Sequence, residues 1–200
     1  VQLSPDTRLT GWDGCSAYHY SDTLVYGFSH THLSGTGCSD YGDILLMPVT
    51  GYEHAEIRND LYRSAFRHEN ETASPGYYSV LLDDYQILVE LTAGPRTGLH
   101  RYTFEKNATP QVVLDLIHRD ELLESKLTVL DDHTVQGMRR SKAWSTDQPI
   151  YFHLEFSRPI VAQRYNADST QVIFEFAPLK RKNVLIAKVG ISNHSCDNAR

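Results

Sequence analysis

Apolar and polar positions alternate in short runs from about residue 77 to residue 190. In residues 86–92, for example, Ile87, Val89 and Leu91 would lie on one face of an extended strand, because successive side chains of a strand point to opposite faces. The runs are rich in β-branched and aromatic residues, and clusters of Gly, Pro, Asn and Asp separate them about every ten residues. This spacing predicts an antiparallel β-sandwich.

The same pattern predicts further strands over residues 76–82, 99–104, 111–117, 122–130, 134–139, 150–156, 160–165, 171–176 and 183–191. Residues 110–118 come closest to a helical period, but their β-branched residues favour a strand there too. The expected fold class is therefore all-β, an antiparallel two-sheet β-sandwich, with residues 1–200 forming one domain.

The first 75 residues differ in character from the rest of the chain. They are dense in Gly, Ser, Thr, His and Asp, and their apolar runs, such as residues 24–28 and 44–47, are short. Long loops on a few strands are expected here. Because long structured loops are uncommon in compact domains unless they bind something, this third of the chain is the expected place of the chemistry.

Composition excludes several classes of function. The chain has 40% hydrophobic and 22% charged residues, and its net charge of -6 comes with scattered rather than clustered Lys and Arg, so no nucleic-acid partner is expected. No apolar run approaches the roughly 20 residues that cross a bilayer, so no membrane partner is expected either. The 12 tyrosines and 10 histidines are compatible with sugar binding.

The three cysteines, Cys15, Cys38 and Cys196, do not describe a disulfide framework. Pairing of Cys15 with Cys38 stays open beside free, partly buried thiols. The chain begins without methionine and ends in a polar segment, so further sequence is expected on both sides.

Residues 27–43, which read GFSHTHLSGTGCSDYGD, combine two imidazoles, small hydroxyl side chains and glycines that let a backbone approach a ligand. His30 and His32 could bind a metal with Asp40 or Asp43, could brace the loop through backbone hydrogen bonds, or could belong to a carbohydrate-facing loop. A phosphate-binding loop is excluded because no Gly-Lys-Ser/Thr sequence follows.

Four segments resemble, in the right order, the motifs of glycoside hydrolase family 92. They are residues 1–7 (VQLSPDT), 11–22 (GWDGCSAYHYSD), 27–43 and 68–78 (HENETASPGYY), and the similarity continues through residues 91–93, 96–104, 150–152 and 188–192. The chain thus resembles, over nearly its whole length, the N-terminal domain of a bacterial family 92 α-mannosidase.

The resemblance implies a supersandwich-like β-sandwich that packs on a missing C-terminal (α/α)6 barrel domain of the same chain. It also implies a calcium-dependent, inverting exo-α-mannosidase that removes terminal α-linked mannose, with α-1,2 linkages expected, from mannose-containing glycans. The catalytic acid, the base and the calcium ligands would lie in the barrel, so no catalytic or metal-binding residue is assigned in this chain, which alone is expected to be inactive. The implied location is secreted, periplasmic or at the bacterial cell surface.

The sandwich would form part of the substrate pocket. Trp12 is the residue expected against a sugar ring, because an indole face covers the apolar side of a pyranose. The remaining candidate substrate-binding residues come from residues 11–22 and from residues 27–43, here called the signature segment: Asp13, Cys15, Ser16, His30, His32, Ser34, Gly35, Thr36, Gly37 and Cys38. At least one of the two histidines is expected to orient the loop rather than face the sugar.

Other conspicuous residues are assigned structural roles. Glu71 is expected to tie down the turn before the strand at Tyr77, and Trp144 to lie in the core. Arg96, His100 and Arg101 are expected to form surface charge pairs.

Two rival functions stay open. A stand-alone carbohydrate-binding module would need no second domain, whereas a purely structural domain would only support the barrel and could self-associate when isolated.

Overall fold

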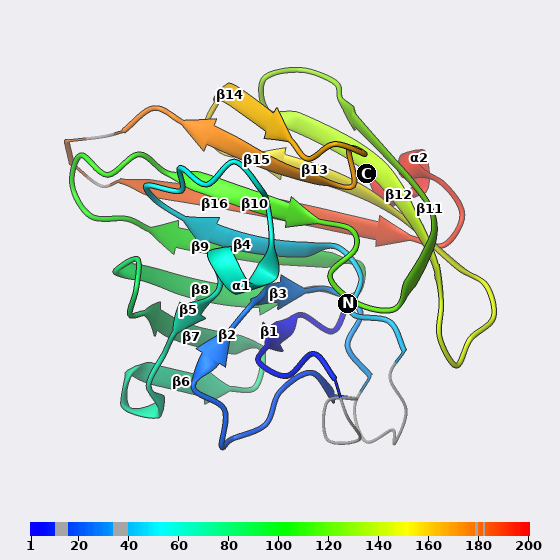
Figure 1. Ribbon diagram of the computed structural model, residues 1–200, viewed down its shortest axis with the longest axis horizontal. Helices are drawn as coiled ribbons and strands as arrows, with labels where there is room; N and C mark the ends of the chain where they lie inside the picture. Colours follow the sequence, from blue (N-terminus) through cyan, green and yellow to red (C-terminus); the bar gives the residue numbers. More distant parts are fainter. Residues whose placement is uncertain (11–15, 34–39, 179, 182) are drawn as a thin grey trace.

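The fold was analysed in a computed structural model of the chain, which describes residues 1–10, 16–33, 40–178, 180–181 and 183–200. Two antiparallel sheets form the body of the fold (Figure 1). The six-stranded sheet has the order β1 (Ser4–Asp6), β3 (Gly27–Ser29), β4 (Leu45–Val49), β10 (Gln111–Asp115), β15 (Gln171–Phe176) and β14 (Ile160–Tyr165).

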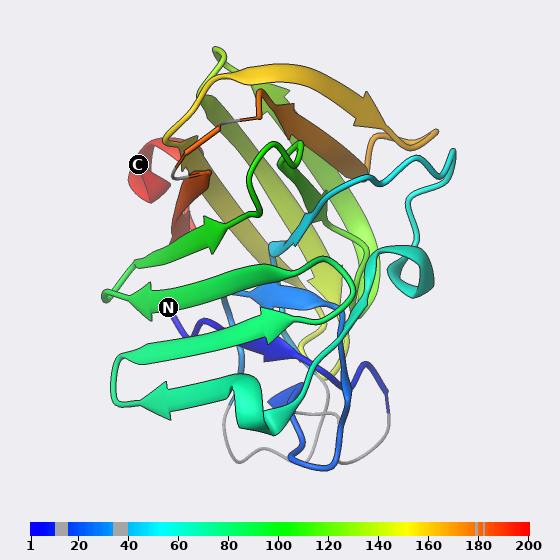
Figure 2. The ribbon, with the colours of Figure 1, turned by 90° about the vertical axis from the view of Figure 1, so that its left-hand side faces the viewer.

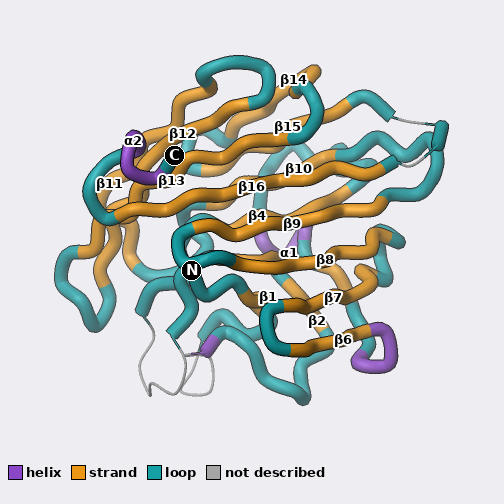
Figure 3. The backbone as a smooth tube through the Cα atoms, turned by 180° about the vertical axis from the view of Figure 1, so that it is seen from behind, coloured by secondary structure: helices purple, strands orange, loops and turns teal. Residues whose placement is uncertain are grey.

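The eight-stranded sheet has the order β11 (Glu121–Val129), β12 (Thr134–Lys142), β13 (Gln148–Phe156), β16 (Val184–Ser192), β9 (Thr97–Thr103), β8 (Ile87–Ala93), β7 (Tyr77–Leu82) and β6 (Glu71–Ser74). A short pair, β2 (Leu24–Val25) with β5 (Ser64–Ala65), stands apart from both sheets. Helical turns are brief: α1 (Asn59–Tyr62), η2 (His68–Asn70) and α2 (Cys196–Ala199) (Figure 3).

The predicted all-β class is confirmed, and each strand expected from the alternating pattern contains or overlaps an observed strand. In β12 burial alternates along the whole strand, since one face meets the core and the other meets solvent. In β10 and β4 every residue is buried. These two strands lie in the middle of the six-stranded sheet, and both of its faces are covered there.

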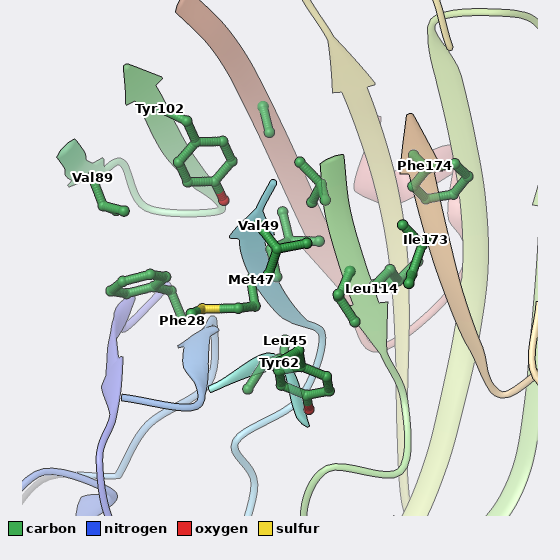
Figure 4. Close-up of a cluster of buried hydrophobic side chains, with 14 of the residues drawn as sticks. Phe28, Leu45, Met47, Val49, Tyr62, Val89, Tyr102, Leu114, Ile173 and Phe174 are labelled. Atoms are coloured by element: carbon green, nitrogen blue, oxygen red, sulfur yellow. The ribbon is translucent and has the colours of Figure 1, made fainter. Parts of the chain in front are cut away.

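The outer cover of β10 comes from the segment between β4 and β5. The Tyr52 amide donates to Gln111 Oε1 at 2.9 Å, and the Tyr62 hydroxyl donates to Asp115 Oδ2 at 2.6 Å. The inner face carries the main core, to which Phe28 and Leu114 of one sheet and Val89 and Tyr102 of the other belong (Figure 4). Burying each such side chain stabilises the fold by about 1.5–3 kcal/mol.

The prediction for Trp144 is wrong. Its side chain is 78% exposed, in the turn between β12 and β13. An indole next to alanine in a strand-rich region resembles a core residue in sequence, but here the hairpin extends beyond the area that the opposite sheet covers.

No helix in the described part of the chain has the length and apolar character that a membrane span requires.

Candidate functional site

The sequence places the candidate site in two segments, residues 11–16 and 27–43. Eight of the predicted residues lie outside the part of the chain that the structure describes: Trp12, Asp13, Cys15, Ser34, Gly35, Thr36, Gly37 and Cys38. Ser16, His30 and His32 are described, together with the residues that hold the two segments in place.

His30 joins the two sheets through a chain of buried hydrogen bonds. Its Nδ1 lies 2.6 Å from the Ile44 carbonyl oxygen, and its Nε2 lies 2.9 Å from Nε2 of His100 in β9. His100 Nδ1 in turn lies 2.9 Å from the Tyr102 hydroxyl. All three side chains are fully buried.

Only one arrangement of protons satisfies this chain with neutral rings. A carbonyl oxygen can only accept, so His30 Nδ1 donates to Ile44, which leaves His30 Nε2 to accept from His100 and His100 Nδ1 to accept from Tyr102. Burial lowers the pKa of His30 to about 4, although its bond to the Ile44 carbonyl opposes this shift. Burial and the neighbouring His30 hold the pKa of His100 well below its usual value.

His32 belongs to a second, charged cluster. Its Nδ1 donates to the Ser16 carbonyl at 3.1 Å, and its Nε2 lies 2.7 Å from Ser29 Oγ and 3.3 Å from Asp6 Oδ2. The other oxygen of Asp6 accepts from His118 Nε2 at 3.1 Å. The cluster therefore connects β1 to the loop that leads out of residues 11–15.

The electrostatics of this cluster favour an ionised Asp6. Burial alone would raise the pKa of Asp6, but the charges of His32 and His118 and their hydrogen bonds hold it well below its usual range. For His32, burial would lower the pKa, but the Asp6 carboxylate raises it overall. Asp6 and His32 thus form a buried ion pair.

A third cluster fixes the end of the signature segment. Asp43 Oδ1 accepts from the guanidinium of Arg139 in β12, and Asp43 Oδ2 accepts from Thr31 at 2.8 Å and from Gln148 at 3.0 Å. Arg139 also donates to the Leu116 carbonyl at 2.7 Å. Both charged side chains are at most 1% exposed, so this ion pair crosses between the sheets in the interior.

Strained backbone flanks the same segments. Ala17, Tyr41 and Ile44 have φ angles of 59°, 70° and 58°. A β-branched residue in the left-handed region costs roughly 1–2 kcal/mol, so the surrounding contacts must hold Ile44 there. Such strain concentrates at functional segments.

Both predicted histidines thus lie in the interior of the described fold. His30 is fully buried and His32 is 6% exposed, and the ring nitrogens of both are engaged inside the fold. Orientation of the loop is the role that this geometry supports for both residues. Within the described residues, no group of three or more His, Cys, Asp or Glu side chains could hold a metal ion.

Glu71 has a structural role, as expected, but it holds segments other than the turn before Tyr77. It accepts hydrogen bonds from Tyr18, from Tyr78 and from His68, so it joins the loop after residue 16 to β7.

Sequence reasoning missed several residues that build these clusters. The expectation of a surface charge pair is wrong for His100, which is fully buried, whereas Arg101 does pair at the surface with Glu90 at 2.8 Å. No sequence pattern identified four further members of the clusters, namely Asp6, His118, Arg139 and Gln148. In β9, Gly98, His100 and Tyr102 alternate and could have marked an inner face. That face has no aliphatic residue, because the single aliphatic residue of β9, Leu99, lies on the other face.

The chain is also similar to a known protein family. The family model described as "Glycosyl hydrolase family 92 N-terminal domain" matches residues 1–192. No curated protein matches the chain.

Solved structures of this family share the fold. The chain is 32% identical to the family GH92 α-mannosidase BT3965 from Bacteroides thetaiotaomicron, with a TM-score of 0.87 over 100% of this chain and 31% of that one. The family GH92 glycosyl hydrolase ccman5 is 26% identical, with a TM-score of 0.82 over 99% of this chain and 30% of that one. The chain thus spans less than a third of these relatives. The inverting mannosidase BT2199 of B. thetaiotaomicron, 24% identical, has the same fold, with a TM-score of 0.81 over 98% of this chain and 28% of that one.

Replacing Asp6 by Asn should destabilise the protein by about 3–5 kcal/mol, because removing one partner leaves the other charge buried and unpaired. Urea unfolding measures the loss. Asp132→Asn is the matched control, since Asp132 is 64% exposed and lies 4.0 Å from its histidine neighbour. Equal stability of the two variants would contradict the buried ion pair.

The hydrogen-bond chain of His30, His100 and Tyr102 predicts that the folded protein loses stability as the pH falls from 6.5 to about 4. In this range the unfolded state binds a proton at His30 that the folded state does not, because the folded pKa is lowered to about 4, so stability decreases as the pH falls, by up to about 1.4 kcal/mol per pH unit. His32 acts in the opposite sense: its contribution is complete below pH 6.5 and is lost as the pH rises through its raised pKa. Urea unfolding across the acid range, with NMR titration of the His30 ring, measures the effect; a ring that titrates near pH 6.5 would contradict it.

Proposed function

Because the chain belongs to glycosyl hydrolase family 92 as its N-terminal domain, we propose that it forms part of the substrate pocket of a longer α-mannosidase. The substrate is a glycan with terminal α-linked mannose, with α-1,2 linkages as the proposed preference. A C-terminal barrel domain supplies the remainder of the pocket and the catalytic groups.

The observation that supports this proposal most directly is the bracing of the two candidate loops. Ser16 and Asp43 end the two candidate segments and His32 lies within the second, and buried or partly buried hydrogen bonds fix all three. A binding site needs its loops held in one geometry before the ligand arrives. The three clusters provide such support at the described ends of the two segments.

Three carboxylates of the clusters that hold the candidate segments and the loop after residue 16 are engaged in structural contacts. Inverting glycoside hydrolysis needs two carboxyl groups roughly 6.5–9.5 Å apart with a water molecule between them. Asp6 and Asp43 are buried in ion pairs, and Glu71 accepts from three donors. We therefore propose that the acid and the base of an inverting mechanism both come from the barrel domain.

Calcium is proposed as the cofactor of the complete enzyme. Calcium takes six to eight oxygen ligands, many of them carboxylates. The acidic residues of the described ranges do not gather into such a group, so this part of the chain does not fit the ion, and its ligands are proposed to belong to the barrel. A location outside the cytoplasm, either secreted, periplasmic or at the cell surface, is part of the same proposal.

In the complete enzyme, Trp12→Ala should reduce kcat/KM for α-mannosides at least about 10-fold, which corresponds to about 1.4 kcal/mol of lost transition-state binding. The reason is loss of the aromatic face that we propose against the sugar ring. Steady-state kinetics measure the change. Trp144→Ala removes the exposed indole of the β12–β13 turn and should leave kinetics unchanged; equal rates for both variants and the wild type would remove Trp12 from the site.

Isothermal titration of the 200-residue chain with mannobiose separates the proposed function from its rivals. Half of a pocket should bind the sugar too weakly for detection, whereas the complete enzyme with its turnover blocked should bind it. Tight binding by the chain alone would favour a stand-alone carbohydrate-binding module. If loop substitutions lower the melting temperature of the complete enzyme without changing its kinetics, a purely structural domain would be favoured.

A further inference from the structure

The edges of the two sheets meet at one end of the sandwich and leave a cleft there. β1 is the outer strand of the six-stranded sheet and β6 that of the eight-stranded sheet, and the two strands lie near each other in all three views (Figures 1, 2 and 3). A hollow of about 440 Å³ between them is lined by Pro5, by Ala73 and Tyr78, and by the segment that carries Tyr18 and Tyr20. Small-ligand pockets commonly measure about 300–1,000 Å³.

One wall of this edge cleft is a rigid aromatic platform. The rings of Tyr20 and His68 stack at a centroid distance of 4.1 Å and an interplanar angle of 14°. Phe66 packs edge-on against His68 at 5.3 Å and holds it in place. Tyr20 is nevertheless 71% exposed, so it presents a fixed ring to solvent. A pyranose buries its apolar CH face on such a ring.

A buried carboxylate positions the polar groups of the cleft. The Glu71 side chain is 9% exposed and accepts from the Tyr18 hydroxyl at 3.0 Å, the Tyr78 hydroxyl at 2.7 Å and His68 Nδ1 at 2.7 Å. Because both phenols donate to Glu71, their oxygens keep lone pairs that can accept from sugar hydroxyls. The bond to Glu71 also raises the pKa of His68, and hydrogen bonds to the backbone of Tyr20 and Asp22 act in the same direction.

The cleft continues past the first hollow. A second hollow of about 240 Å³ shares Ala73 and Tyr78 with it and extends along the β6–β7 hairpin to Tyr77 and Thr92. The two hollows adjoin each other at Ala73 and Tyr78, so a glycan of more than one sugar unit could lie across both.

We propose that this edge cleft, with Tyr20 as its stacking platform, binds a neutral hexose unit of the glycan beyond the terminal mannose. The proposal rests on the proposed function in one respect, the choice of a mannose-containing glycan as the ligand. It assigns to this domain a share in recognising extended substrates, separate from the loops that face the terminal sugar.

The test compares substrates of different length in the complete enzyme. Tyr20→Ala should raise KM about 5- to 10-fold for a linear α-mannotetraose, while kcat/KM for an aryl α-mannoside stays unchanged, because the aryl substrate does not reach the cleft. Tyr20→Phe keeps the stacking ring and should behave as the wild type. Tyr165→Ala, which removes a tyrosine 37% exposed on β14 at the opposite sheet edge, is the control for loss of a surface ring.

Calorimetric titration with α-mannotetraose, which needs no turnover, separates the two proposals. Binding that depends on Tyr20 in a protein that does not hydrolyse mannosides would uphold the cleft and overturn the proposed function. Equal losses for the short and the long substrate, or a lower melting temperature of Tyr20→Ala without any length-dependent effect, would overturn the cleft and indicate packing of the platform against another domain. Unchanged kinetics and unchanged binding for both substrates would overturn it as well.

Discussion

The Asp43–Arg139 ion pair constrains the end of the sandwich at which the candidate loops are rooted. A buried guanidinium must keep a counter-charge and partners for its remaining donors, because an unpaired buried charge costs several kcal/mol. Arg139 meets this need with Asp43 from one side and with backbone carbonyls after β10 from the other. Asp43 is therefore held at one place beside β12.

Around this fixed point, two histidines close in sequence meet opposite environments. His30 enters the interface between the sheets, where its partners are a carbonyl and another neutral ring, and its pKa is lowered. His32 reaches the carboxylate of Asp6, and its pKa is raised. One neutral and one charged cluster thus hold the chain at residues 30–32. Each cluster depends on partners that come from distant strands.

The acidic residues of the domain and its aromatic residues serve different ends. Asp6, Asp43 and Glu71 are committed to holding segments together. At the edge cleft the buried carboxylate fixes His68 and two tyrosines, and Tyr20, stacked on His68, offers its face outward. A domain that supports, orients and stacks is a suitable complement to a domain that supplies acid, base and metal, as the proposed function requires.

The sequence by itself determined the all-β class, the positions of the strands from β7 to β16 and the family, because alternation and ordered motifs are local properties of the chain. A structural role for Glu71 could also be predicted, but not its partners Tyr18, His68 and Tyr78. Only the tertiary structure decided that Trp144 is exposed, that His100 is buried and that Asp6 pairs with His118, which is 112 residues away. Burial and charge pairing depend on which faces meet across the two sheets, and the pattern of a single strand such as β9 does not contain that information.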